Sequence, residues 1–226
     1  MIELKNEITG IISDTHFPGH VDGALDFVLE TGLAWGIKQW VHIGDVVDYH
    51  YISHHPNELG CLNPVEEYEK AKEEVQKWYK HFPNLHICIG NHDAIPVRQL
   101  ASLGMPDMFT PTFNTLYETP SWTWAEEYKI YNNTLIDHGM GSGGMYGAKN
   151  TANKLGVSYI QGHTHAHGAQ FDLPRPLYDA AALNVGCLMD KDKYFAAYGK
   201  KYKMPVSLGM GVACSDSEMY FIKYKG

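Results

Sequence analysis

Five short polar clusters, spread along the chain, constrain this sequence more than any other feature. Each follows a short apolar run of the kind that forms a buried strand. The clusters are Asp14-x-His16, Gly44-Asp45-x-x-Asp48, Gly90-Asn91-His92, His138-Gly139 and Gly162-His163-x-His165. Strands that end in polar groups are typical of an α/β fold whose ligand-binding residues lie at the carboxyl ends of its strands.

The first half of the chain alternates predicted strands and helices. Apolar runs at 8–13, 40–43 and 85–89 predict strands, and residues 23–37 and 64–82 predict helices. The second helix has the clearest start, because Asn63 is a good N-cap, Pro64 suits the first helical position, and Glu66 has capping-box spacing.

The second half predicts a different order of elements. A hairpin around Asn132-Asn133 is expected at 129–136, followed by a helix at 148–155. Further strands are expected at 158–160, 182–188, 207–214 and 218–224. We therefore expect one domain, residues 1–226, with two packed sheets flanked by helices. Residues 94–128 look long and irregular, and we expect them to form a lid or a wall of the substrate pocket.

Charge and composition limit which binding partners and which cellular location we expect. The net charge of −8, from 18 basic and 26 acidic residues, disfavours bulk electrostatic binding to DNA or an anionic membrane. No apolar run approaches the ~18 residues of a membrane span, and the charged start lacks a signal core, so we expect a cytoplasmic protein. The four cysteines form no Cys-x-x-Cys pair and are interpreted as reduced thiols.

The clusters contain the donors of a metal site. Oxygen and nitrogen ligands from Asp, Asn and His suit Mn²⁺, Fe, Zn²⁺, Co²⁺ or Ni²⁺. Residues i and i+2 of an extended segment point the same way, so Asp14 with His16, and His163 with His165, are predicted to face one side. Seven candidate ligands are too many for one tetrahedral ion and fit two ions about 3.5–4 Å apart that share a carboxylate.

In this order, the clusters resemble the motif series of the calcineurin-like metallophosphoesterases, from Asp14 to His165. The resemblance implies a four-layer αββα sandwich of two mixed β-sheets and a two-metal hydrolytic site. The first ion would be held by Asp14, His16, Asp45 and His165, and the second by Asp45, Asn91, His138 and His163, with Asp45 bridging. His92 would be the catalytic histidine that binds no metal, and Asp48 would orient it.

The implied activity is hydrolysis of a small phosphomonoester or phosphodiester by in-line attack of a metal-bridging hydroxide, with two Mn²⁺ ions as the first choice of cofactor. His92 would protonate the leaving oxygen. Arg98, six residues after His92, is a candidate phosphate contact, with a surface salt bridge as the alternative. Tyr49 stands where the family's phosphoprotein phosphatases have Arg, which argues against that branch. Asp93 stands where many members have Glu, a change to which we attach little weight.

Two other functions remain open at this point. A nuclease of the same superfamily is favoured by residues 190–203, where five lysines alternate with aromatic residues, and is opposed by the negative net charge. A non-catalytic interaction scaffold is the third, as in relatives that have lost the catalytic His or several ligands. All of these residues are present here. The natural substrate and the oligomeric state are left open.

Overall fold

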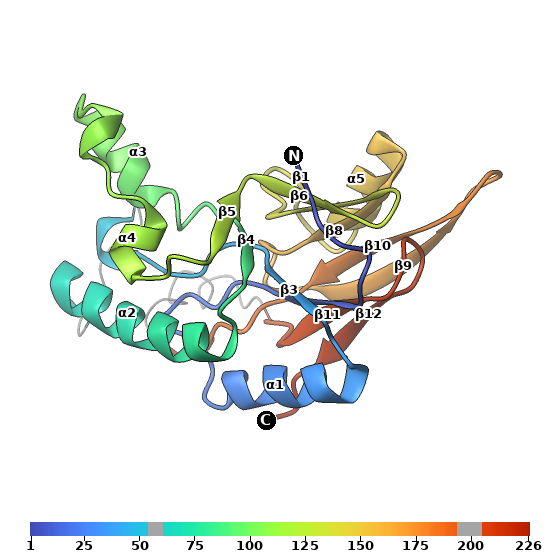
Figure 1. Ribbon diagram of the computed structural model, residues 1–226, viewed down its shortest axis with the longest axis horizontal. Coiled ribbons are helices and arrows are strands. Elements are labelled where there is room, and N and C mark those ends of the chain that lie inside the picture. The colour runs from blue at the N-terminus through green and yellow to red at the C-terminus, as the bar shows by residue number, and fades with distance from the viewer. Residues whose placement is uncertain (54–60, 194–204) are drawn as a thin grey trace.

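A computed structural model describes residues 1–53, 61–193 and 205–226 of the chain. Within these residues, two six-stranded β-sheets pack face to face and helices cover their outer sides. In Figure 1, α1 lies on one side of the sheets and α5 on the other. This arrangement confirms the predicted sandwich of two mixed sheets flanked by helices.

One sheet carries three of the five polar clusters. Its strand order is β12-β11-β2-β3-β4-β5, with β2 to β5 parallel and β11 antiparallel to both of its neighbours. The strands are β2 (Thr9–Ile12), β3 (Gln39–His42), β4 (His86–Cys88), β5 (Thr123–Ala125), β11 (Gly209–Ala213) and β12 (Met219–Lys223). The parallel strands β2, β3 and β4 therefore end at one edge of the sheet, where the clusters begin.

The other sheet carries the remaining two clusters, and its order is β1-β6-β7-β8-β10-β9. Its strands are β1 (Ile2–Glu3), β6 (Glu127–Ile130), β7 (Thr134–Asp137), β8 (Ser158–Gln161), β9 (Gly168–Pro174) and β10 (Asp179–Val185). The predicted hairpin is confirmed as the antiparallel pair β6 and β7. β7 runs parallel to β8, so both polar clusters of this sheet leave at the same end.

Apolar side chains hold the four layers together. Between the sheets, Ile11 and Val41 pack in one fully buried cluster with Ile136 and Ile160. Helices α1 (Ala24–Trp35) and α2 (Pro64–His81) cover the sheet that contains β2, and α5 (Gly147–Leu155) covers the sheet that contains β8. Burial of these apolar surfaces is the main favourable contribution to folding.

The start of α2 matches its prediction. The Asn63 side chain accepts hydrogen bonds from the backbone N–H groups of Val65 and Glu66, and the Glu66 side chain accepts from the Asn63 N–H. One acidic residue of the helix, Glu67, is buried. Its carboxylate accepts hydrogen bonds from the turn that precedes the helix.

Residues 94–128 are not irregular, and this part of the prediction is wrong. They form α3 (Ile95–Ser102), the 3-10 turn η2 (Asp107–Phe109), α4 (Phe113–Tyr117), β5 and the start of β6. The buried Trp122 donates a hydrogen bond from Nε1 to the Phe82 carbonyl 2.7 Å away. β5 has three residues, too few to show a period, so its pairing with β4 was not visible in the sequence. The role of these residues as a lid or a pocket wall stays a prediction.

Among the described residues, no helix is both long and apolar enough to cross a membrane. The four cysteines are free, as expected, and Cys88 and Cys187 are buried among apolar neighbours.

Candidate metal centre

The five clusters meet at the ends of five strands. Each follows β2, β3 or β4 of one sheet, or β7 or β8 of the other. Three groups of side chains gather there, with candidate ligand atoms within 4.8 Å of one another in each group. The groups are Asp14, His16, Asp45 and His165; Asp45, His138 and His163; and His16, Asp48 and His92. Asp45 belongs to the first two, so the two predicted ligand sets lie side by side.

The backbone at the cluster differs from the prediction. Asp14, His16, Asp45, His163 and His165 have φ values of 49°, 47°, 52°, 65° and 40°, in the left-handed region. The expectation that extended i, i+2 spacing turns each pair to one side is therefore wrong, although the side chains do converge. Non-glycine residues in this region cost of order 1–3 kcal/mol each, and they cluster at functional sites.

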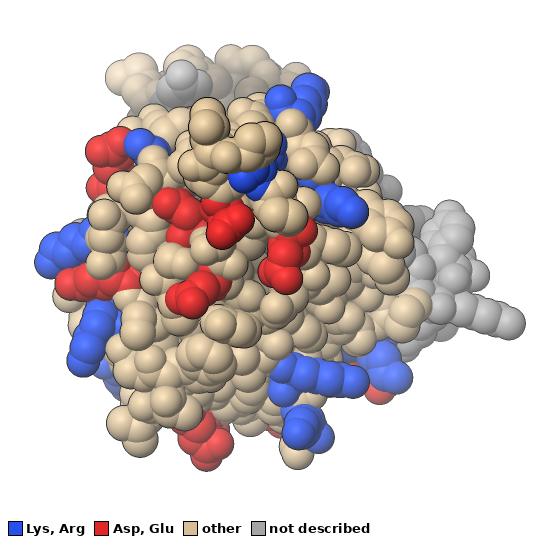
Figure 2. All heavy atoms as spheres, turned by 90° about the vertical axis from the view of Figure 1, so that its right-hand side faces the viewer, with Lys and Arg blue, Asp and Glu red and all other residues tan. Residues whose placement is uncertain are grey.

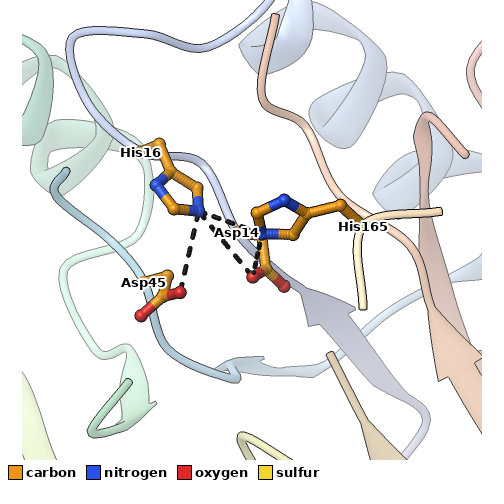
Figure 3. A group of neighbouring side chains, drawn as sticks. All are labelled: Asp14, His16, Asp45 and His165. Carbon is orange, nitrogen blue, oxygen red and sulfur yellow. Dashed lines mark hydrogen bonds and ion pairs between the residues drawn. The ribbon is translucent and has the colours of Figure 1, made fainter. Parts of the chain in front are cut away.

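The first group converges on the Nε2 atom of His16, as Figure 3 shows. This atom lies 3.8 Å from Asp14 Oδ1, 3.7 Å from Asp45 Oδ2 and 3.1 Å from His165 Nε2. His165 Nε2 in turn lies 2.9 Å from Asp14 Oδ1. Asp14 and His16 are wholly buried, whereas His165 is partly exposed and marks the open side of the group.

The second group is built around His138. Its Nε2 atom lies 3.3 Å from Asp45 Oδ2, 3.2 Å from His163 Nδ1 and 2.9 Å from Asn91 Oδ1. The structure therefore brings the predicted ligand Asn91 to the same place as the three charged or ionisable residues. Asn91 and His163 are partly exposed, and Asp45 and His138 are buried.

These distances fit a pair of bound cations. Ligand atoms about 2.0–2.2 Å from one ion lie roughly 3–3.5 Å from their neighbours, close to the separations found here. All of the donors are carboxylate oxygen, amide oxygen or imidazole nitrogen, the set that suits first-row divalent metals. The residues present therefore fit the two-metal centre that the motif series implies.

The electrostatic field of the cluster also favours cations. Burial alone would raise the pKa of Asp14 and Asp45, but the neighbouring histidines outweigh it and hold both carboxyl groups well below their usual range. Burial would lower the pKa of His138, but the charge of Asp45 reverses this effect and raises the pKa to about 10. The two ionised, buried carboxylates attract divalent cations, and His138 would release its second proton when it binds one.

Hydrogen bonds from Nδ1 fix the orientation of two of the histidine rings. His16 Nδ1 donates to Asp48 Oδ1 at 2.6 Å, and His138 Nδ1 donates to the Ile43 carbonyl at 2.8 Å. In both rings Nε2 therefore faces the cluster as an acceptor, the arrangement that supports metal ligation.

Asp48 contacts more than one histidine. His92 Nδ1 donates to the backbone carbonyl of Asp48 at 2.6 Å and lies 3.2 Å from its carboxylate. The shorter carboxylate contact, at 2.6 Å, is to His16. Asp48 therefore lies behind a predicted ligand as well as behind the predicted catalytic histidine, a second contact that the motif did not indicate.

Asp93 is the residue that the sequence analysis undervalued. It is wholly buried, and its carboxylate accepts hydrogen bonds from the backbone N–H groups of Asp45 at 2.8 Å, Val46 at 3.0 Å and Gly90 at 2.9 Å. Burial raises the pKa of Asp93 to about 6. The side chain thus ties the loop after β3 to the loop after β4. Its position directly after His92 was the only signal available in the sequence.

Close approach of the two loops also requires glycine. A Cβ atom at Gly90 would collide with the backbone nitrogen and the carboxylate of Asp45. Glycine at position 90 is therefore a packing requirement beneath the shared carboxylate.

The two remaining predicted positions lie at the edge of the cluster or outside it. Arg98 is exposed on α3, and its guanidinium donates to the Asn91 carbonyl at 2.7 Å. Tyr49 points away from the ligands, into the apolar core, where its hydroxyl is bonded to that of Tyr117. No cationic side chain therefore occupies the position after Asp48.

The fold and the cluster define a class of α/β sandwich proteins with candidate metal ligands at the strand ends of both sheets. The family model of the calcineurin-like phosphoesterases matches residues 9–202. The chain belongs to this family, as the motif series predicted. No curated protein matches the chain.

Solved structures with a similar chain path include three named proteins. Vacuolar protein sorting 29 from Cryptosporidium parvum is 13% identical with a TM-score of 0.49, over 96% of this chain and 92% of that one. The phosphoesterase YfcE from E. coli is 18% identical with a TM-score of 0.38, over 94% and 96%. The nuclease MPE from Pseudomonas putida is 13% identical with a TM-score of 0.42, over 83% and 80%.

Proposed function

We propose that this protein is a dinuclear metal-dependent phosphoesterase that hydrolyses phosphomonoester or phosphodiester bonds of small molecules. The observation that carries the proposal is the position of Asp45. Its Oδ2 atom lies 3.7 Å from His16 Nε2 and 3.3 Å from His138 Nε2, so one carboxylate faces both ligand groups. Membership of the calcineurin-like phosphoesterases supports the reaction class.

Seven residues would hold the two cations. The first cation would bind to Asp14, His16, Asp45 and His165, and the second to Asp45, Asn91, His138 and His163. When bound, two divalent cations supply a water nucleophile at neutral pH and neutralise charge on the phosphoryl oxygens. Mn²⁺ is our first choice of metal. The choice of Mn²⁺ and a cytoplasmic location stay predictions.

His92 would donate the proton to the leaving oxygen. Its Nδ1 atom donates to the Asp48 carbonyl, so Nε2 is the nitrogen that exchanges a proton with substrate. Burial alone would lower the pKa of His92, but the nearby Asp45 and Asp48 carboxylates outweigh it and raise the pKa in the cation-free protein. This direction favours the protonated imidazole that a general acid needs. Asp48 would orient the ring, and Arg98 is the proposed phosphate contact at the rim.

The test is hydrolysis of p-nitrophenyl phosphate and bis-p-nitrophenyl phosphate by the full chain loaded with Mn²⁺. We expect turnover of at least one of the two. His92→Ala should lower kcat by roughly 10²–10⁴-fold while the protein still binds metal. His81→Ala, at an exposed position at the end of α2, is the matched control and should keep wild-type turnover. Failure of the wild type to hydrolyse either ester with Mn²⁺, Co²⁺, Ni²⁺ or Zn²⁺ rejects the proposed enzyme.

The nuclease alternative has weaker support. Most of the Lys-rich segment that favours it, residues 194–203, lies outside the described residues. Figure 2 shows one face of the molecule, where acidic side chains gather near the centre and basic ones lie around them. On this face the described residues form no continuous basic track for a nucleic-acid backbone. Release of p-nitrophenol by protein that leaves single- and double-stranded DNA intact at physiological salt would exclude a nuclease.

A further inference from the structure

A partly enclosed apolar cavity of about 210 Å³ lies beside the metal cluster and is separate from it. It is bounded by the turn that follows β3, by α2, by α3 and by residues 110–116, which include the start of α4. These helices lie together at one end of the molecule in Figure 1. Among the described residues, none of the seven predicted ligands lines the cavity, and neither do Asp48 and His92.

Aromatic rings form part of the cavity wall, together with aliphatic side chains. Phe17, Tyr49, Tyr68 and Phe113 contribute rings from four different segments of the chain. Aromatic rings favour stacked or edge-to-face contacts with another ring, which gives such a cavity a preference for aromatic ligands over aliphatic ones of equal size.

The cavity offers little to a charged ligand. Glu67 is the acidic side chain among its described lining residues, and in its ionised form it repels phosphate and other anions. Both of its carboxylate oxygens already accept hydrogen bonds, from the backbone N–H groups of His50 at 2.6 Å and Tyr51 at 3.1 Å. Glu67 thus disfavours an anionic occupant, and the hydrogen bonds to both of its oxygens reduce its attraction for a cation, so an uncharged occupant fits best.

Its size exceeds that of an ordinary packing defect. Protein interiors are close-packed, and voids larger than a water molecule are few. An apolar cavity of roughly 150 Å³ lined by aliphatic and aromatic side chains is large enough to bind benzene. At about 210 Å³, this cavity has room for a ring system somewhat larger than benzene.

We propose that the cavity is a binding site for a small uncharged aromatic molecule of one ring or two fused rings. The site is distinct from the metal cluster, and its occupancy does not depend on hydrolytic activity. Val47 and Tyr49, the neighbours of Asp48 in the chain, form part of its wall, so the occupant would contact the back of the turn that carries Asp48.

The experiment titrates indole into the full metal-free chain and measures binding by calorimetry. Val97→Trp places a large ring at the cavity wall on α3, at a residue that is 41% exposed in the wild type. Val65→Trp is the matched control, because Val65 is a helical valine that is 63% exposed and does not line the cavity. We expect saturable binding of one indole per chain, about tenfold or more weaker in Val97→Trp and unchanged in Val65→Trp.

A second measurement needs no variant. Nuclear Overhauser contacts from bound indole to the rings of Tyr68 and Phe113 should appear in the wild type, so the proposal stays testable even if Val97→Trp fails to fold. The absence of saturable indole binding, equal weakening in both variants, or tighter binding of tetramethylammonium than of indole would each overturn the proposal. Because the metal-free chain is used, these outcomes are independent of whether the protein hydrolyses phosphoesters.

Discussion

The two sides of the turn from Val47 to Tyr49 have opposite chemistry. On one side, the buried Asp48 carboxylate contacts His16 and lies 3.2 Å from His92. On the other side, Val47 and Tyr49 line an apolar cavity. The polar side depends on charges and hydrogen bonds with defined partners, whereas the apolar side depends on shape and volume. Substitutions on the polar side should therefore alter metal binding and rate, and those on the apolar side should alter packing and ligand binding.

Asp45→Asn should have the largest effect on the polar side. The substitution keeps the shape of the side chain but removes the charge that faces both ligand groups. We expect affinity for Mn²⁺ to fall by more than roughly 100-fold, the upper end for residues that only support ligands, and the metal content to fall below two ions per chain. Elemental analysis after Mn²⁺ loading and calorimetric titration measure both. Asp22→Asn, at a fully exposed side chain, is the control. Two tightly bound ions in Asp45→Asn would contradict the shared role of this carboxylate.

Asp48→Asn should have an intermediate effect on two readouts. The loss of the charge behind His16 should weaken Mn²⁺ binding by roughly 10–100-fold, because outer partners orient metal-binding histidines and increase their basicity. The kcat should also fall, because His92 loses the nearby carboxylate at 3.2 Å. Asp172→Asn, at an exposed position of β9, is the control and should change neither value. A lower kcat with unchanged metal affinity would show that Asp48 acts through His92 alone.

Glu67→Gln should have the smallest effect, and it should depend on pH. Burial raises the pKa of Glu67 from about 4.5 to about 7 in the folded protein. The folded state therefore binds this proton more tightly than the unfolded state does. Protonated Glu67 adds to the free energy of unfolding at low pH, and this contribution is lost as pH rises from about 4.5 through 7. The variant lacks this group, so the unfolding free energy of the wild type minus that of Glu67→Gln should decrease over this range and level off above it.

Urea unfolding of both proteins at pH 5, 6, 7 and 8 measures this difference. Glu69→Gln, an exposed position two residues along the same helix, should give a difference that does not change with pH. A constant difference for Glu67→Gln as well would show that its carboxyl group is as well solvated in the folded state as in the unfolded state.

Much of the fold was predictable because its signals are local. The capping box at Asn63 and the apolar runs of β2, β3 and β4 need only a few consecutive residues to be recognised. The strand β9 was not predicted, although it forms a hairpin with β10, its neighbour in sequence. The short strand β5 has too few residues to show a period, and its partner β4 is distant in sequence.

The sequence by itself determined which donors are available and in what order, because the residue types after each strand follow directly from it. Only the tertiary structure decided how these donors converge, through left-handed backbone at Asp14, Asp45 and His163 that a pattern of extended residues does not predict. The same is true of Asp93 and Glu67, whose carboxylates bind backbone N–H groups of distant loops. A side chain's residue type is local information, whereas its hydrogen-bond partners depend on which segments the packing of two sheets brings together.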